Sequence, residues 1–164
     1  MAAVVAVNRF GPDQFPVDPA LGSTGYIDGG LLVSPSAGSG TSVGTVVPTP
    51  HGTPTSVVLG VNLQPAVSSA YVASSIPGYG GAQLDYSIPD NYAVVAWQGT
   101  YKLTWDGSGS NKLGALVYVS KLVDGQVGFD STSSPTLIGV CVDPNAASAT
   151  SGSQILVRFT GNVS

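Results

Sequence analysis

Hydrophobic and polar positions alternate with a period of two in the second half of the chain. After Gly99, the segment "TYKLTW" places its apolar residues on one face of an extended strand and its polar residues on the other. The run "GALVYVSKLV" (114–123) leads into Asp124-Gly125 and then "QVGF", which is the sequence signature of a β-hairpin. The last segment, "QILVRFTG" (154–161), also alternates, and both of its faces are mostly apolar. We therefore expect it in the centre of a barrel or sandwich.

Residues 1–40 lack this alternation. The segment "NRFGPDQFPVDPALGSTGY" (8–26) holds three prolines and several apolar side chains, which a merely solvated tail would have little reason to carry. We expect an extended N-terminal arm over residues 1–40 and a β-barrel-like domain over residues 41–164. The alternative to the arm is a terminus without fixed structure. The arm could add a strand to the sheet of a partner protein, or pair within its own barrel. Its candidate partner-binding residues are Val4, Val5, Val7, Phe10 and Phe15.

Three short phrases occur twice, in the same order. They are "GGLLVS" (29–34) with "LGALVYVS" (113–120), "SVGTV" (42–46) with "QVGFD" (126–130), and "VLGVNLQP" (58–65) with "LIGVCVDP" (137–144). The offsets between matching glycines are 84, 84 and 79 residues (114 − 30, 128 − 44 and 139 − 60). We interpret the pattern as a diverged tandem unit of strand, hairpin, strand and Gly-Val, in which glycine allows close backbone approach or a bend. Chance resemblance in a chain rich in Gly and Val is the alternative.

The composition is typical of an all-β protein. The chain has 164 residues with 22 glycines and 12 prolines, and Val, Thr and Tyr fill the intervals, as in short strands joined by turns. Hydrophobic residues make up 43% and charged residues 9%, which is not the composition of a disordered segment. The length suits one domain or two small related lobes. We expect a small β-barrel or sandwich of short antiparallel strands.

Charge and hydropathy argue against nucleic acid and membrane as partners. The net charge is −4 and the five Lys and Arg residues are scattered, so no basic stripe exists to neutralise phosphates. The longest apolar runs, residues 2–7 and 92–97, are far shorter than the ~20 residues of a membrane helix. No positive charge precedes residues 2–7, so a secretory signal is not indicated.

Few side chains could carry chemistry. Glu is absent, and the only histidine, His51, stands in "TPHGTP", where we expect an exposed loop residue without a placeable catalytic partner. Asp13, Asp18 and Asp28 could ligate calcium, but their spacing matches no EF-hand, and aspartate is common in turns for turn chemistry. Cys141 lies between two valines, and we expect it in the core. We predict no catalytic residue, no metal and no cofactor, and therefore not an enzyme.

Three segments of the second half together resemble phage capsid decoration, or cement, proteins. They are "AVVAWQGTYKL", "LGALVYVS" and "LIGVCVDPNAASATSGSQILVRFTGN". The family's "Gly-small-x-Val-Tyr", "Ile-Gly-Val" and "Val-Arg-hydrophobic" strands match Gly114–Tyr118, Ile138–Val140 and Ile155–Gly161. The best-matched part is residues 92–164, a little under half of the chain. The first half departs from the family pattern by a longer arm and an expanded stretch over residues 45–91.

The resemblance implies a homotrimer on the outer surface of the virion, where it would hold neighbouring copies of the major capsid protein together. Such a role requires no chemistry, and three contacts engaged together gain avidity. The alternative is a carbohydrate-binding β-module on a phage appendage or cell surface. It depends on Trp97, Tyr101 and Trp105 forming an aromatic strip that stacks on sugar rings, although such strips in small barrels more often seal the core.

Overall fold

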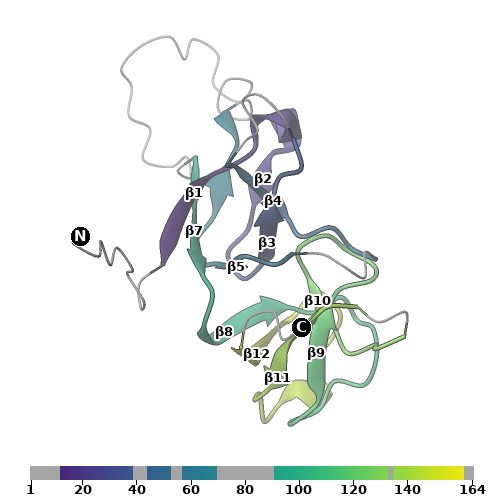
Figure 1. Ribbon diagram of the computed structural model, residues 1–164. Coiled ribbons are helices and arrows are strands. Elements are labelled where there is room, and N and C mark those ends of the chain that lie inside the picture. Colours follow the sequence, from purple (N-terminus) through teal and green to yellow (C-terminus); the bar gives the residue numbers. More distant parts are fainter. Residues whose placement is uncertain (1–11, 39–43, 53–56, 70–90, 133–134, 161–164) are drawn as a thin grey trace, which may run out of the picture.

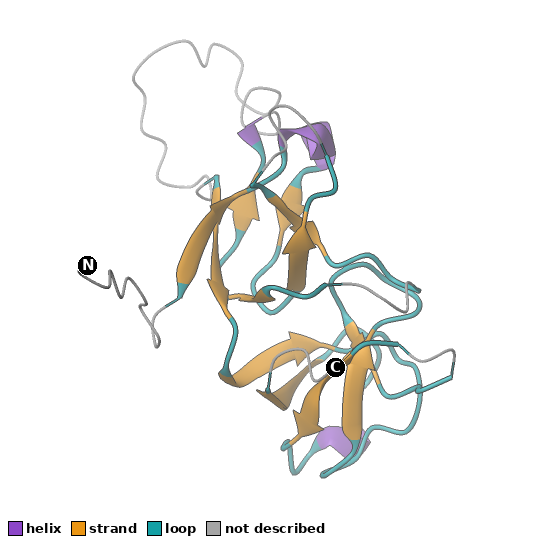
Figure 2. Cartoon of the chain, in the orientation of Figure 1, coloured by secondary structure: helices purple, strands orange, loops and turns teal. Residues whose placement is uncertain are grey.

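The computed structural model describes residues 12–38, 44–52, 57–69, 91–132 and 135–160. Within these residues the strands form two five-stranded sheets and one two-stranded sheet, and every pair of neighbouring strands is antiparallel. Figure 2 shows two groups of strands with short helical turns at their outer ends. The expected all-β fold is confirmed.

The first lobe covers residues 13–96. Its main sheet has the order β1-β7-β5-β3-β4. The strands are β1 (Asp13–Pro16), β3 (Leu32–Pro35), β4 (Val46–Pro48), β5 (Gly60–Asn62) and β7 (Tyr92–Ala96). The remaining elements are the 3-10 helix η1 (Pro19–Thr24) and the paired strands β2 (Tyr26–Ile27) and β6 (Ala66–Val67). A bridge from Val17 to Val46 joins the two edges of the main sheet at one end, as in a small barrel.

The second lobe covers residues 99–160 and lies below the first in Figure 1. Its sheet has the order β10-β9-β11-β12-β8. The elements are β8 (Gly99–Thr104), β9 (Leu116–Val119), β10 (Val127–Gly128), β11 (Leu137–Cys141), the 3-10 helix η3 (Ala146–Ser148) and β12 (Gln154–Phe159). The hairpin predicted at Asp124-Gly125 joins β9 to β10, and β12 has a strand on each side, as predicted for the last segment. A bridge from Trp105 to Val127 joins the sheet edges.

The two main sheets have one topology. Replacing β1, β3, β4, β5 and β7 by β8, β9, β10, β11 and β12 converts the first strand order into the second, read from the opposite edge. The register also agrees, because Val33 pairs with Gly60 in the first lobe and Val117 with Gly139 in the second. These are the positions at which the sequence phrases match, so the predicted tandem unit is confirmed.

The middle phrase is the exception, because its match is displaced by three residues. Val46 and Val127 make equivalent bridges to the ends of β1 and β8. The structural counterpart of Gly44 is therefore Gly125 and not Gly128. Both of these glycines have a positive φ, 76° and 73°, which an L side chain rarely adopts.

Close backbone approach explains why both copies keep Gly-Val. A Cβ atom on Gly60 would overlap the carbonyl oxygen of Ala96 on β7, and one on Gly139 would overlap the carbonyl oxygen of Arg158 on β12. Neither glycine has a positive φ, so the constraint is the space beside the neighbouring strand and not backbone strain.

Each lobe also buries one aspartate, and the two aspartates make equivalent hydrogen bonds in their own lobes. Asp106 accepts the backbone N–H of Ser108 (2.7 Å) and the hydroxyl of Ser120 (2.5 Å). Asp18 accepts the N–H of the residue two positions on and the hydroxyl of the serine that follows β3. Both aspartates are buried, so their carboxylates serve to fix a turn against a neighbouring strand.

The described part of the expected N-terminal arm belongs to the first lobe. Of residues 1–40, the structure describes 12–38, and β1 pairs with β7 over its whole length while β3 pairs with β4 and β5. This segment therefore uses its strands within its own sheet. Residues 1–11 lie outside the described residues. The division between the two lobes falls at residues 97–98, between β7 and β8, and the predicted boundary at residue 40 lies outside the described residues.

Candidate functional site

The two lobes share a buried junction. Three residues of the first lobe lie buried in the core cluster of the second lobe: Leu32 on β3, Val58 just before β5, and Val61 on β5. The other core cluster holds only residues of the first lobe, among them Val33 and Val95. The first lobe therefore packs the outward face of its main sheet against the core of the second lobe.

Backbone hydrogen bonds fix this junction. The N–H of Leu32 donates to the carbonyl of Gly125 (2.6 Å), and the N–H of Gly125 donates to the carbonyl of Thr49 (2.8 Å). The N–H of Thr104 donates to the carbonyl of Gly30 (3.3 Å). The β9–β10 turn and the edge strand β8 are thus the parts of the second lobe that bond to the first lobe.

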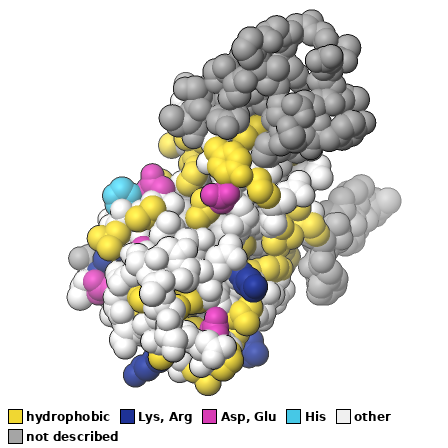
Figure 3. Space-filling model, turned by 180° about the vertical axis from the view of Figure 1, so that it is seen from behind, with side chains coloured by type: hydrophobic (Ala, Val, Ile, Leu, Met, Phe, Trp, Pro, Cys, Tyr) yellow, Lys and Arg dark blue, Asp and Glu magenta, His cyan; other side chains and the backbone are white. Residues whose placement is uncertain are grey.

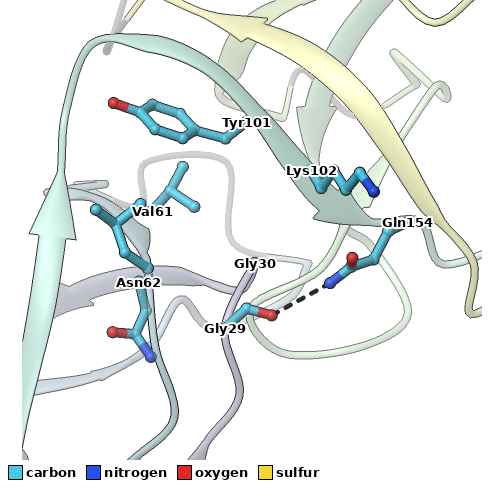
Figure 4. Close-up of a pocket in the computed structure, with 8 residues that line it drawn as sticks. Gly29, Gly30, Val61, Asn62, Tyr101, Lys102 and Gln154 are labelled. Carbon is cyan, nitrogen blue, oxygen red and sulfur yellow. Dashed lines mark hydrogen bonds between the residues drawn. The ribbon is translucent and has the colours of Figure 1, made fainter.

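A pocket of about 290 Å³ opens at the junction. In Figure 4, Tyr101 and Lys102 lie on one side of it, and Gln154 reaches across to donate to the carbonyl of Gly29 (3.4 Å). The amide of Asn62 points away from Tyr101 and donates to the carbonyls of Ile27, Asp28 and Gln64, so it ties the turn before β3 to the segment after β5. The described residues that line the pocket include no carboxylate and no histidine, so they do not form an acid–base pair.

His51 lies beside the same junction and has a partner that the sequence did not reveal. Its Nδ1 is 2.6 Å from Oδ1 of Asp124, and its backbone N–H donates to the same oxygen (2.8 Å). Both side chains are more than half exposed. Figure 3 shows the histidine at the surface next to an acidic side chain. The pair ties the loop after β4 to the β9–β10 turn, and His51 is an exposed loop residue as predicted.

Reactive and metal-binding groups are scarce in the described part of the chain. Cys141 is buried as predicted, and desolvation raises the pKa of its thiol, which favours the neutral and unreactive form. No group of three or more His, Cys, Asp or Glu side chains in these ranges could hold a metal ion. Among the same residues, no helix has both the length and the hydropathy to cross a membrane.

The three aromatic residues proposed as a sugar-binding strip are separated. Trp97 lies in the segment between the lobes and is 42% exposed. Trp105 is buried, with its ring 6.0 Å from that of Phe129 in an edge-to-face contact and its Nε1 donating to the carbonyl of Ser108. Tyr101 is half-buried and packs against the core cluster of the second lobe. The strip does not form because Trp105 faces the core while Trp97 precedes the strand.

An exposed apolar surface lies on the outward side of the second lobe. Leu116 on β9 is 48% exposed, and Leu113 just before that strand is 62% exposed. Leu137 and Val140 on the neighbouring strand β11 are half-buried. We call Leu116, Leu137 and Val140 the outer face of the second lobe. Neighbouring apolar side chains that remain exposed on a folded domain are typical of an interaction site.

The predicted partner-binding residues fall mostly outside this description. Val4, Val5, Val7 and Phe10 lie outside the described residues. Phe15 lies on β1, is half-buried and packs against the core cluster of the first lobe. The outer face of the second lobe is thus a candidate interaction surface that sequence reasoning missed. Leu116 and Val140 nevertheless lie within two of the three repeated phrases, "LGALVYVS" and "LIGVCVDP".

No family model, curated protein or solved structure matches the chain. The candidate interaction surface therefore depends on the geometry of this molecule alone.

Proposed function

We propose that the chain is a capsid decoration protein that binds the outer surface of an assembled phage capsid as a homotrimer and stabilises contacts between major capsid subunits. The observation that carries the proposal is the exposed outer face of the second lobe, an apolar surface that is available for contact between the chains of the trimer. It lies on a β-lobe whose described residues offer neither a catalytic constellation nor a metal site. A binding role fits such a surface better than catalysis does.

The physical mechanism is linkage. A protein that binds the assembled lattice, and not free subunits, stabilises the lattice by RT ln(1 + [L]/Kd), about 2.7 kcal/mol per site at a hundredfold excess over Kd. A trimer that engages three subunits at once also gains affinity from effective concentration. No reactive group is needed for either effect.

The proposal assigns capsid contact to the N-terminal segment. Val4, Val5, Val7 and Phe10 would add main-chain hydrogen bonds and apolar contacts to the edge of a capsid subunit's sheet. Phe15 already packs in the first lobe, so its contribution would be to hold the start of β1 in place.

Co-sedimentation tests the proposal. The purified chain is mixed with mature capsids that lack it, taken from the virus that encodes the chain, and bound protein is measured against concentration. We expect saturable binding, weakened by Val5→Asp and unchanged by Val57→Asp, a matched control at a valine that is exposed in the first half of the chain. The absence of any binding to such capsids would refute the proposal.

The carbohydrate-binding alternative lacks a supporting observation. Of the three aromatic side chains that it requires, Trp97 alone is exposed, at 42%, and one ring gives no extended stacking platform. Specific binding on a glycan array that disappears in Trp97→Ala, together with no capsid binding, would replace the decoration proposal with this one.

A further inference from the structure

The junction between the lobes leaves a matching surface unused. Because the lobes are two copies of one unit, each residue that the first lobe contributes to the junction has a counterpart in the second lobe. Leu32, Val58 and Val61 correspond to Leu116, Leu137 and Val140, which form the outer face.

Burial separates the two sets. Leu32 is 0% exposed, whereas Leu116, at the same place in the sheet, is 48% exposed. Val61 is buried, and its counterpart Val140 is half-buried. The sequence keeps an apolar residue at each position, although in the described part of the chain only the first set is buried.

Two pairs of glycines show the same contrast. Gly30 and Gly114 are counterparts with φ of 85° and 82°. A Cβ on Gly30 would lie 2.7 Å from the carbonyl oxygen of Lys102 across the junction, whereas a Cβ on Gly114 meets nothing within 4 Å. On the receiving side, a Cβ on Gly125 would touch the first lobe at 3.1 Å, whereas its counterpart Gly44 meets nothing within 4 Å. Each of the two surfaces that meet in the junction therefore has a counterpart with open space beside its glycine. We call these two counterparts the open copies.

The charges on the two open copies are opposite. In the junction, Val61 pairs with Ala96 and lines the same pocket as Tyr101. The counterpart of Ala96 is Arg158, and the counterpart of Tyr101 is Asp13. Both charged side chains are exposed. If the open copies met as the lobes meet, Arg158 of one chain, which pairs with Val140, would lie near Asp13 of the next.

One contact would be missing. Thr104 donates its N–H to Gly30 across the junction, but its counterpart in the first lobe is Pro16, which has no N–H. The lobes of one chain are also linked covalently. We therefore expect contact between chains to be weaker than contact between lobes.

We propose that the outer face of the second lobe binds the first lobe of a second copy of this chain by repeating the contact that joins the lobes. Such a head-to-tail contact is heterologous, so it closes into a ring or extends. Closure with three chains would give a ring of six lobes. The inference specifies the surface of the proposed homotrimer and does not rest on capsid binding.

Sedimentation velocity of the full chain tests this inference, at concentrations up to roughly 1 mM so that weak contacts are detected. We expect the molar mass of the wild type to exceed that of one chain. Leu116→Asp should raise the Kd of self-association about tenfold or more, since a charge would be buried against apolar groups. Leu122→Asp is the matched control, because Leu122 is 60% exposed and lies outside the outer face, and it should leave the Kd unchanged.

Charge reversal provides a test that does not depend on the effect of any single substitution on folding. Arg158→Asp and Asp13→Arg should each weaken self-association by about fivefold, and the double variant should restore it. A wild type that remains monomeric, equal effects of Leu116→Asp and Leu122→Asp, or a double variant as weak as the singles would overturn the inference. A monomer whose capsid binding is lost in Leu116→Asp would also overturn it, because the capsid would then occupy the outer face; capsid binding would remain the proposed function, but not as a homotrimer.

Discussion

Replacing Gly139 by alanine should destabilise the second lobe strongly. The added methyl group would overlap the carbonyl oxygen of Arg158 and lie 3.0 Å from its carbonyl carbon and 3.2 Å from Cα of Phe159. All three atoms belong to the backbone of β12, so no side chain can rotate away. Relief requires separating β11 from β12, where Gly139 pairs with Phe159 and Cys141 with Val157.

The expected cost follows from these contacts. Overpacking costs about 1–3 kcal/mol, and weakening one or two ladder hydrogen bonds adds about 1 kcal/mol each, so we expect a loss of about 2–5 kcal/mol. This is a large part of the ordinary stability of a small domain, about 5–15 kcal/mol. Gly114→Ala is the control, because Gly114 has open space and only its positive φ opposes a side chain, at about 1–2 kcal/mol.

Urea unfolding followed by tryptophan fluorescence measures both variants, since Trp105 is buried against Phe129 and reports the core of the second lobe. Gly60→Ala, the equivalent change in the first lobe, should behave like Gly139→Ala. If Gly139→Ala lost no more free energy of unfolding than Gly114→Ala, close strand approach would not be the reason for the repeated glycine.

The remaining predictions concern three side chains. Asp106→Ala should lower the free energy of unfolding by about 2–4 kcal/mol in urea titrations, because the buried hydroxyl of Ser120 loses its acceptor; an unchanged midpoint would argue against this role. Cys141 should react with iodoacetamide slowly in the native protein and rapidly in urea, because burial raises the pKa of its thiol; equal rates would contradict its placement. Hydrogen bonds from the N–H and hydroxyl of Thr132, and one from a lysine, lower the pKa of the Asp130 carboxyl. The stabilisation from this carboxylate is present above its unfolded pKa and is lost as pH falls through its folded pKa. Asp130→Asn should therefore make the free energy of unfolding decline less steeply in acid. Identical declines in the wild type and the variant would refute the assignment.

Local signals in the sequence predicted much of the second lobe. The alternation after Gly99, the Asp124-Gly125 turn and the apolar final strand each depend on neighbouring residues, and all three have the predicted structure. The repeated Gly-Val phrase was also informative, because a glycine inside a strand records how close the next strand comes.

Contacts between the lobes could not be predicted in the same way. Leu32 and Leu116 are the same residue in matching phrases, yet one is buried and the other exposed, because burial depends on what lies beyond the sheet. The partner of His51 is 73 positions away at Asp124, and no local pattern indicates it. The early strand β1 was hidden by prolines at both of its ends, so its segment was assigned to an arm.

The most direct test of capsid stabilisation is the temperature at which capsids rupture, followed by release of their DNA, with and without the bound chain. We expect rupture to move to higher temperature as binding approaches saturation, because the chain is bound only by the intact lattice. Capsids that bind the chain to saturation and rupture at the same temperature as bare capsids would contradict it.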